Sequence, residues 1–168
     1  MKRFTVNDIM ALKPCYDYDD VTALIGQGKT LLQIQDLDIP IEDRVWVVIR
    51  LIPTSDVIIF ANLCADRAVR NHALHYGDPQ IEVWAAKWLS GEDRAQKSAA
   101  VMRKLAKQML YVPYVAYVAV CAAHLATWAT ENVTDAKIVQ SAAQTVAAFA
   151  KRSGTLHIND LKQIVGGQ

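Results

Sequence analysis

The chain has no excess of charge of either sign. Its 168 residues include 18 Lys and Arg against 17 Asp and Glu, which leaves a formal net charge of +1. Proteins that bind the phosphate backbone of DNA or RNA concentrate basic residues on the binding face, so we expect no nucleic-acid partner. Hydrophobic residues make up 52% of the chain and charged residues 21%. This balance is typical of a globular domain and argues against an intrinsically disordered one.

Cysteine is scarce, and no secretion signal is recognisable. The three cysteines, Cys15, Cys64 and Cys121, are far apart in the sequence. An odd number of widely separated cysteines does not suit a disulfide framework, so we expect reduced thiols and a cytoplasmic protein. At the N-terminus, Asn7 and Asp8 interrupt the basic start before any apolar segment develops, which excludes the usual signal-peptide pattern.

Long hydrophobic runs are rare, and the main exception is the uncharged segment of residues 109–130. Its length would be sufficient to cross a bilayer. The segment consists largely of Ala, Tyr, Val and Thr and contains Pro113 and His124, so its insertion into lipid would gain little free energy. We therefore predict a buried central helix and no membrane partner.

The chain also lacks a long linker and an internal repeat. Helix start and stop signals divide it into short helices before Pro53 and longer ones after it. The later helices are rich in Ala, which has the highest helix propensity of all residues. These patterns predict an all-α fold, a compact multi-helix bundle in a single domain. Residues 1–53 would form a region of short helices packed on a bundle of longer helices in residues 54–168.

Capping residues predict where individual helices begin. Thr5 and Thr30 are each expected to begin a short helix, and Asp19 or Asp20 is expected to begin another over residues 21–26. Asp78 followed by Pro79 predicts a helix that Gly91 ends. Further helices are expected over residues 41–52, 56–76, 92–111, 113–131 and 136–151, with a short one after residue 159.

Residues 45–49 have features of both a strand and a helix. Their β-branched and aromatic side chains would also suit a strand. Glu42 and Asp43 just before them favour the start of a helix, because negative charge is stabilising there. We therefore predict a helix.

No complete catalytic motif is present. The sequence GQGKT at residues 26–30 resembles the end of a phosphate-binding loop, but residue 23 is Ala where that loop requires Gly. The predicted element before it is a helix, whereas the loop follows a strand. We interpret Gly26 and Gly28 as a helix stop and a turn.

Two pairs of side chains have the spacing of a chemical site. His72 and His75 are three residues apart, which would put both on one helix face, but spacing places no third metal ligand beside them. We expect a polar helix end, with no metal and no cofactor. Cys121 and His124 have the same spacing, which would allow an imidazole to activate a thiol. No acid or amide is placed to orient that imidazole, so we expect a packed core residue.

Tryptophans also have a regular spacing. Trp84 and Trp88 are four residues apart on one predicted helix face. Such a pair usually belongs to the core. If either were exposed, it would be a candidate anchor for a protein partner.

Acidic residues concentrate in the first third of the chain, whereas the predicted helix 92–111 is rich in Lys and Arg. The structural interpretation is that several of these carboxylates cap helices. The functional interpretation is an acidic surface that meets a basic partner protein and speeds their association. The candidate partner-binding residues are Asp17, Asp19, Asp20, Asp36, Asp38, Glu42 and Asp43.

Several stretches resemble a known family. They are ALKPC from residue 11, LIGQGKTLLQIQDLDIPIEDRVWVVIR from residue 24, and NLCADRAV with DPQIEVWAAKWLSGED after it. They are similar to segments of the Ala-rich, all-α immunity proteins of bacterial toxin systems and prophages. The resemblance implies neutralisation of a toxin by direct binding, with no catalytic residue. It matches Trp46, residues 64–67, and Trp88 with Gly91 as determinants of the fold. After Asp93 the chain departs from the family pattern, so a partner recognised there could differ.

Together these features predict a non-enzymatic protein that neutralises a partner protein by binding it. The partner would be a basic toxin, or a component of a host defence system if the gene is phage-borne. Two alternatives stay open. One is a protein that binds a metal or small ligand, or an enzyme, with a site assembled from dispersed residues. The other is a structural homo-oligomer in which an exposed helix face pairs with its own copy.

Overall fold

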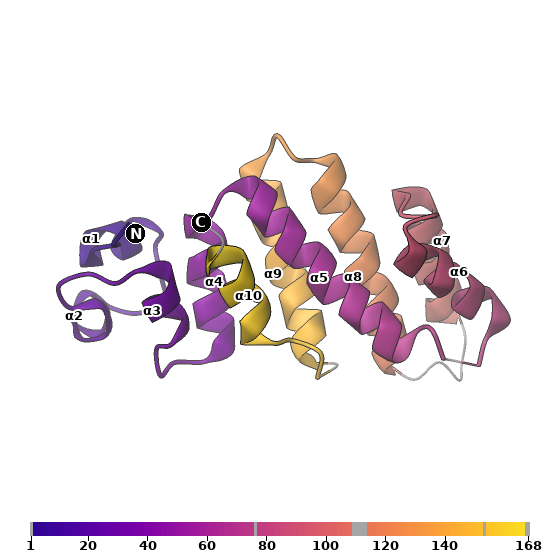
Figure 1. Cartoon of the computed structure of the whole chain (residues 1–168), viewed down its shortest axis with the longest axis horizontal. Helices are drawn as coiled ribbons and strands as arrows, with labels where there is room; N and C mark the ends of the chain where they lie inside the picture. Colours follow the sequence, from indigo (N-terminus) through magenta and orange to yellow (C-terminus); the bar gives the residue numbers. More distant parts are fainter. Residues whose placement is uncertain (1, 76, 109–113, 153, 167–168) are drawn as a thin grey trace. The chain divides into compact units, whose positions relative to one another are not determined.

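The computed structural model describes residues 2–75, 77–108, 114–152 and 154–166, and these residues form an all-α structure (Figure 1). The predicted fold class is confirmed. Within the described ranges, β-type pairing is limited to one isolated bridge between Phe4 and Lys29. The helices of these ranges are α1 (Val6–Ala11), α2 (Tyr18–Ile25), α3 (Leu31–Gln35), α4 (Ile41–Leu51), α5 (Thr54–His72), α6 (Pro79–Ser90), α7 (Gln96–Gln108), α8 (Tyr114–Glu131), α9 (Ala136–Arg152) and α10 (Ile158–Gly166).

The helices belong to two compact units. The first unit combines Met1–Pro53 with His157–Gln168, and the second is Thr54–Leu156. Helix α10 contacts α3 and α4, and its Lys162 forms an ion pair with Asp36 at the end of α3. The sequence analysis grouped this last segment with the bundle of residues 54–168. The structure corrects that grouping, because the partners of α10 are the short helices of the first unit.

Two threonine caps begin helices of the first unit as predicted. The hydroxyl of Thr5 accepts a hydrogen bond from the backbone N–H of Asp8, whose carboxylate accepts one from the N–H of Thr5. Thr30 and Gln33 form the same reciprocal pair at the start of α3. Each pair satisfies backbone donors that a helix start otherwise leaves free.

Helix α2 begins earlier than predicted. Its N-cap is Asp17, whose Oδ1 accepts a hydrogen bond of 2.8 Å from the N–H of Asp20. The prediction that Asp19 or Asp20 is the cap is therefore wrong. Both residues lie in the first turn instead, where their charge interacts favourably with the helix dipole.

Glycines shape the turn after α2, which confirms the helix-stop interpretation. Gly26 has a φ of +55° and donates its N–H to the carbonyl of Thr22. Gly28 has a φ of +98°, and a Cβ at this position would lie 3.2 Å from the carbonyl oxygen of Phe4. Only glycine allows this close passage without strain. Lys29 then exchanges two backbone hydrogen bonds with Phe4.

Residues 45–49 form a helix, as predicted. They lie in α4, with Val45, Val47, Val48 and Ile49 buried. Trp46 is half-buried, and the guanidinium of Arg50 lies 4.0 Å from its ring centroid. Burial of this apolar face outweighs the weak helix propensity of the β-branched side chains.

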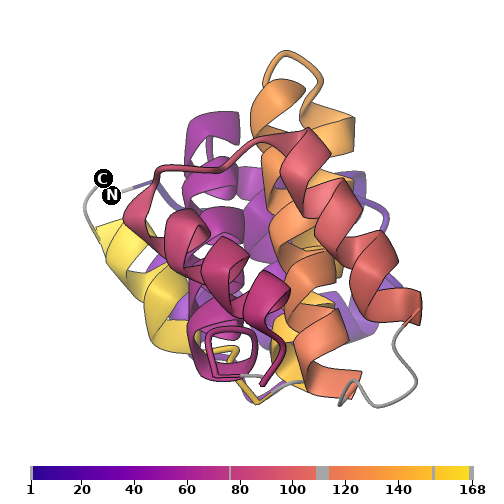
Figure 2. The same cartoon turned by 90° about the vertical axis from the view of Figure 1, so that its right-hand side faces the viewer.

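The second unit is built around α5, α8 and α9, each of which contacts the other two (Figure 1). Small side chains line these helices, so their axes can approach closely. Helix α6 contacts α5 and α7, and α7 contacts α8 (Figure 2). The buried alanines of the three central helices are Ala61, Ala65, Ala68, Ala116, Ala119, Ala122, Ala123, Ala126, Ala129, Ala142, Ala143, Ala147 and Ala150.

The uncharged segment forms α8 in the part that the structure describes. Most of its Ala and Val side chains are buried, so the prediction of a buried central helix is confirmed for α8. Residues 109–113 lie outside the described ranges. Among the described helices, none has the combination of length and apolarity that crossing a membrane requires.

Helix α7 begins at Gln96, four residues after the predicted start at Glu92. The N–H of Asp93 donates to a carbonyl in the last turn of α6, and Oδ1 of Asp93 accepts a hydrogen bond from the N–H of Ala95. Bonds of this kind compete with helix formation, so residues 91–95 form a connecting turn. The predicted helix end at Tyr111 lies outside the described residues.

An Ala143→Leu substitution tests the close packing of the central helices. Ala143 is fully buried on α9, so the larger side chain should lower the free energy of unfolding by about 1–3 kcal/mol. Urea unfolding followed by circular dichroism measures this change. Ala148→Leu, at an exposed site of the same helix, should change it by less than about 0.5 kcal/mol. Equal stability of the two variants would contradict close packing at Ala143.

Candidate functional site

The acidic residues of the predicted partner-binding site lie in the first unit. Asp17, Asp19, Asp20, Asp36, Asp38 and Glu42 are exposed, and Asp43 is half-buried. Residues 17–43 contain a single basic residue, Lys29. We call residues 17–43 the acidic segment. Its seven carboxylates and one ammonium group give it a formal charge of −6.

Several of these carboxylates have partners within the fold. Asp17 caps α2, and Asp36 pairs with Lys162. Asp43 accepts a hydrogen bond of 2.6 Å from the hydroxyl of Tyr16. This bond raises the pKa of Tyr16 to about 12, because it favours the protonated phenol beside a carboxylate. The structural interpretation, helix capping, therefore holds for Asp17, whereas Asp36 and Asp43 have partners of another kind.

Other carboxylates of the acidic segment face solvent. Among the described residues, no hydrogen bond or ion pair engages the side chains of Asp19 and Asp38. Tyr18, directly before Asp19 in α2, is 54% exposed. An exposed aromatic ring among carboxylates is a feature that charge counting alone did not reveal. Aromatic side chains of this kind frequently anchor protein interfaces.

The two histidines proposed as the start of a metal site are not on one helix face. Helix α5 ends at His72, and His75 lies in the turn that follows. His72 is half-buried and His75 is exposed. No group of three or more His, Cys, Asp or Glu side chains suitable for a metal ion occurs among the described residues.

Cys121 and His124 lie on α8 in surroundings that favour their neutral forms. Burial raises the pKa of the Cys121 thiol, although Tyr117 and Arg103 act in the opposite direction. Burial also lowers the pKa of His124, and the charge of Arg103 lowers it further. A reactive cysteine and histidine pair requires a thiolate and an imidazolium. It would need a lowered pKa for the cysteine and a raised pKa for the histidine, which is the opposite of what burial does here. Nδ1 of His124 is buried without a hydrogen-bond partner among the described residues.

A polar network joins α5, α6 and the turn after α6. Asp66 accepts hydrogen bonds from Nε1 of Trp88 at 2.8 Å and from the guanidinium of Arg94 at 2.9 Å. The guanidinium also lies 5.0 Å from the ring centroid of Trp88 and donates to its carbonyl. In the sequence, Asp66 is 22 residues from Trp88 and 28 residues from Arg94. Helical periodicity could therefore not reveal the network.

The network borders a hollow of about 270 Å³ lined by Asn62, Arg94, Thr127, Thr130 and Glu131. The amide of Asn62 donates to the hydroxyl of Thr130 at 3.3 Å. The hydroxyl of Thr127 donates to a carbonyl of its own helix. Because these groups largely pair with one another, the arrangement suits a structural role more than ligand binding.

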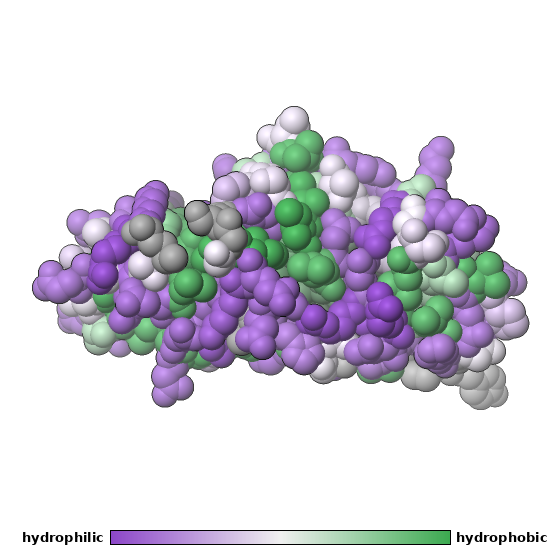
Figure 3. Space-filling model, in the orientation of Figure 1, coloured by the Kyte–Doolittle hydropathy of each residue, from purple (hydrophilic) through white to green (hydrophobic). Residues whose placement is uncertain are grey.

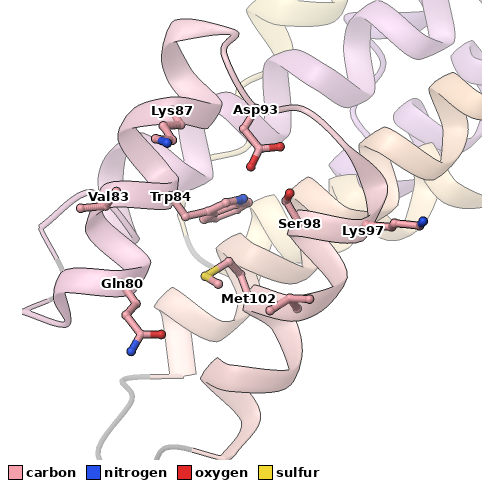
Figure 4. Close-up of a pocket in the computed structure, with 9 residues that line it drawn as sticks. Gln80, Val83, Trp84, Lys87, Asp93, Lys97, Ser98 and Met102 are labelled. Atoms are coloured by element: carbon pink, nitrogen blue, oxygen red, sulfur yellow. The ribbon is translucent and has the colours of Figure 1, made fainter.

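A second depression lies between α6 and α7, and we call it the α6–α7 groove (Figure 4). Its volume is about 330 Å³. Trp84 and Trp88 belong to the core as predicted, with 4% and 0% exposed and ring centroids 5.7 Å apart. Trp84 nevertheless forms part of the groove wall. The lining residues are Gln80, Val83, Trp84, Lys87, Asp93, Lys97, Ser98, Val101 and Met102.

An Asp66→Ala substitution tests the polar network. It would remove the acceptor for Trp88 and the counter-charge of Arg94, so the free energy of unfolding should fall by about 2 kcal/mol. Urea unfolding measures the change. The matched control is Glu92→Ala, which breaks the exposed pair of Lys87 and Glu92 and should cost less than about 1 kcal/mol. An Asp66 variant no less stable than the control would contradict a stabilising network.

The burial of His124 predicts a loss of stability in mild acid. Because its pKa is below the ordinary value of 6.5 in the folded protein, the unfolded chain binds this proton at a higher pH. The free energy of unfolding should therefore decrease as the pH falls through about 6.5. In a His124→Gln variant this decrease, measured by urea unfolding from pH ~7 to pH ~5, should be smaller. His75→Gln, in an exposed turn, is the control, and equal decreases in both variants would contradict the assignment.

Comparison with known proteins assigns no function to these residues. No family model, curated protein or solved structure matches the chain. Among the described residues, the acidic segment and the α6–α7 groove present exposed charged and apolar groups that a partner could contact.

Proposed function

We propose that the chain is a non-enzymatic protein that binds a partner protein directly and inhibits it, in the manner of an immunity protein or a phage-encoded counter-defence protein. The proposed contact surface is the acidic segment, and the proposed partner is a basic toxin or a component of a defence system. The resemblance to immunity proteins suggests the class of activity. The charge and exposure of the first unit suggest the surface.

The observation that carries the proposal is the density of exposed carboxylates. Six of the seven acidic residues of this segment are exposed. Helix capping explains Asp17, but it does not require Asp19 or Asp38, whose carboxylates meet no partner among the described residues. Clustered like charges repel one another, so their concentration needs a compensating role. A basic partner would relieve this repulsion and would be attracted over distances of about 10 Å at moderate salt.

Tyr18 gives this surface a second type of contact. Its ring is 54% exposed between Asp17 and Asp19. Charged residues at the rim of an interface mainly increase the association rate, whereas a buried aromatic anchor slows dissociation. A surface with both features suits an inhibitor, which has to find its target quickly and remain bound.

Affinity capture from the native host followed by native mass spectrometry tests the proposal. We expect a basic protein in a stoichiometric complex that forms less readily as salt is raised. With that protein purified, an Asp19→Asn/Asp38→Asn variant should associate about tenfold more slowly at low salt. Glu92→Gln/Glu131→Gln removes the same charge from the second unit and should leave the rate unchanged. Recovery of the chain alone at every salt concentration, or equal rates for both variants, would count against the proposal.

A further inference from the structure

The α6–α7 groove combines exposed apolar side chains with an unpaired donor. Val83 of α6 is 58% exposed and Val101 of α7 is 59% exposed. Figure 3 shows hydrophobic residues surrounded by hydrophilic ones over these two helices. Figure 4 shows Trp84 and Met102 pointing toward each other, with the indole nitrogen directed toward Ser98. This nitrogen is buried and has no hydrogen-bond partner among the described residues.

The α7 side of the groove is basic. Lys97, Val101 and Lys104 follow one another at helical spacing, which places them along one face of α7. All three are exposed, and α7 has no acidic residue. Across the groove, α6 contributes Lys87, which pairs with Glu92. Asp93 is the one acidic residue of the lining. The groove therefore suits an apolar or aromatic anchor that is flanked by carboxylates.

The chain itself contains such an element. Helix α2 begins with Tyr18, which is the one aromatic residue among the exposed large hydrophobic side chains that the structure describes. Asp17, Asp19 and Asp20 surround it in sequence, and all are exposed. The phenol ring can fill an apolar groove while its hydroxyl stays in contact with solvent at the rim.

We propose that the α6–α7 groove binds α2 of a second copy of this chain, with Tyr18 as the anchor between Val83 and Val101. The carboxylates beside Tyr18 then face Lys97 and Lys104. Apolar contact supplies the affinity and charge complementarity supplies the orientation. The argument depends on the groove and on α2, and it does not rest on the proposed function.

The two surfaces are different parts of the chain, which determines the form of the assembly. A contact between unlike surfaces leaves one groove and one α2 unoccupied at the ends of an open chain of copies, so further copies can add head to tail until a ring closes. A contact made by one short helix in one groove is small compared with permanent interfaces, so the association should be weak and reversible.

Sedimentation equilibrium of the full chain at increasing concentration tests this assembly. At ~20 mM salt the average mass should rise above the monomer mass of 18.6 kDa with concentration, and ~500 mM salt should reverse the rise. Monomers at all concentrations would overturn the proposal. If α2 instead contacted the groove of its own chain, the average mass would also stay at the monomer value at every concentration. That result would equally overturn the proposal.

Variants blocked on one surface make the test specific. Tyr18→Ser removes the anchor, and Val101→Glu places a charge in the groove; both sites are more than half exposed, and circular dichroism checks folding. Each variant alone should remain monomeric. An equimolar mixture should form dimers of twice 18.6 kDa and nothing larger, because each variant retains the surface that the other lacks. If Val101→Glu fails to fold, Val83→Glu blocks the groove in its place.

Val133→Glu is the control variant. It adds the same negative charge as Val101→Glu at a site that is 50% exposed and outside the groove, so this variant should associate like the unmodified chain. Association that survives in either blocked variant, or a mixture that stays monomeric, would overturn the proposal. Since no partner protein is present, these results are independent of any inhibition by the acidic segment.

Discussion

The close approach of α5, α8 and α9 is the constraint on which the second unit depends. Each of these helices contacts the other two, and the side chains between them are mostly Ala. An Ala-lined contact buries little apolar surface per residue, so stability requires long helices with few gaps. The same constraint explains why α8 can be uncharged without being a membrane helix. Neighbouring helices cover it on several sides, and solvent has little access to most of its Ala and Val side chains.

This core leaves the outer helices less completely packed. Among the described residues of α7, the buried ones are the small Ala99 and Ala106. The polar network of Asp66, Trp88 and Arg94 ties the α6–α7 turn to α5 instead. The space that remains between the two helices is the α6–α7 groove.

Local signals allowed most of the fold to be predicted, because a cap acts within three or four residues. Thr5, Thr30 and Asp78 each cap the helix that the sequence assigned to them. Competing local signals were harder to rank, since Asp17, Asp19 and Asp20 are all good caps and only the first has the extended backbone of an N-cap. The late start of α7 depends on a backbone bond from Asp93 to the end of α6, which no residue preference reveals.

The candidate site was predictable to a smaller extent. Charge counting located the acidic segment, but the exposure of Tyr18 within it depends on how α2 packs. The pairing of Asp36 with Lys162 joins residues 126 positions apart. The groove is lined by residues of both α6 and α7, and helical periodicity describes one helix at a time. Properties that depend on contacts between segments far apart in the sequence could therefore not be predicted from it.

The assignment of α10 to the first unit also has a consequence for the order in which the protein folds during synthesis. The first unit is discontinuous, and Thr54–Leu156 is inserted between its two parts. A ribosome releases the short N-terminal helices first, yet α3 and α4 contact α10, which is translated only after the whole second unit. The central helices can pack while the nascent chain is still growing, whereas the first unit has to wait for the last contact. The acidic surface would thus become fully ordered only after α10 leaves the ribosome.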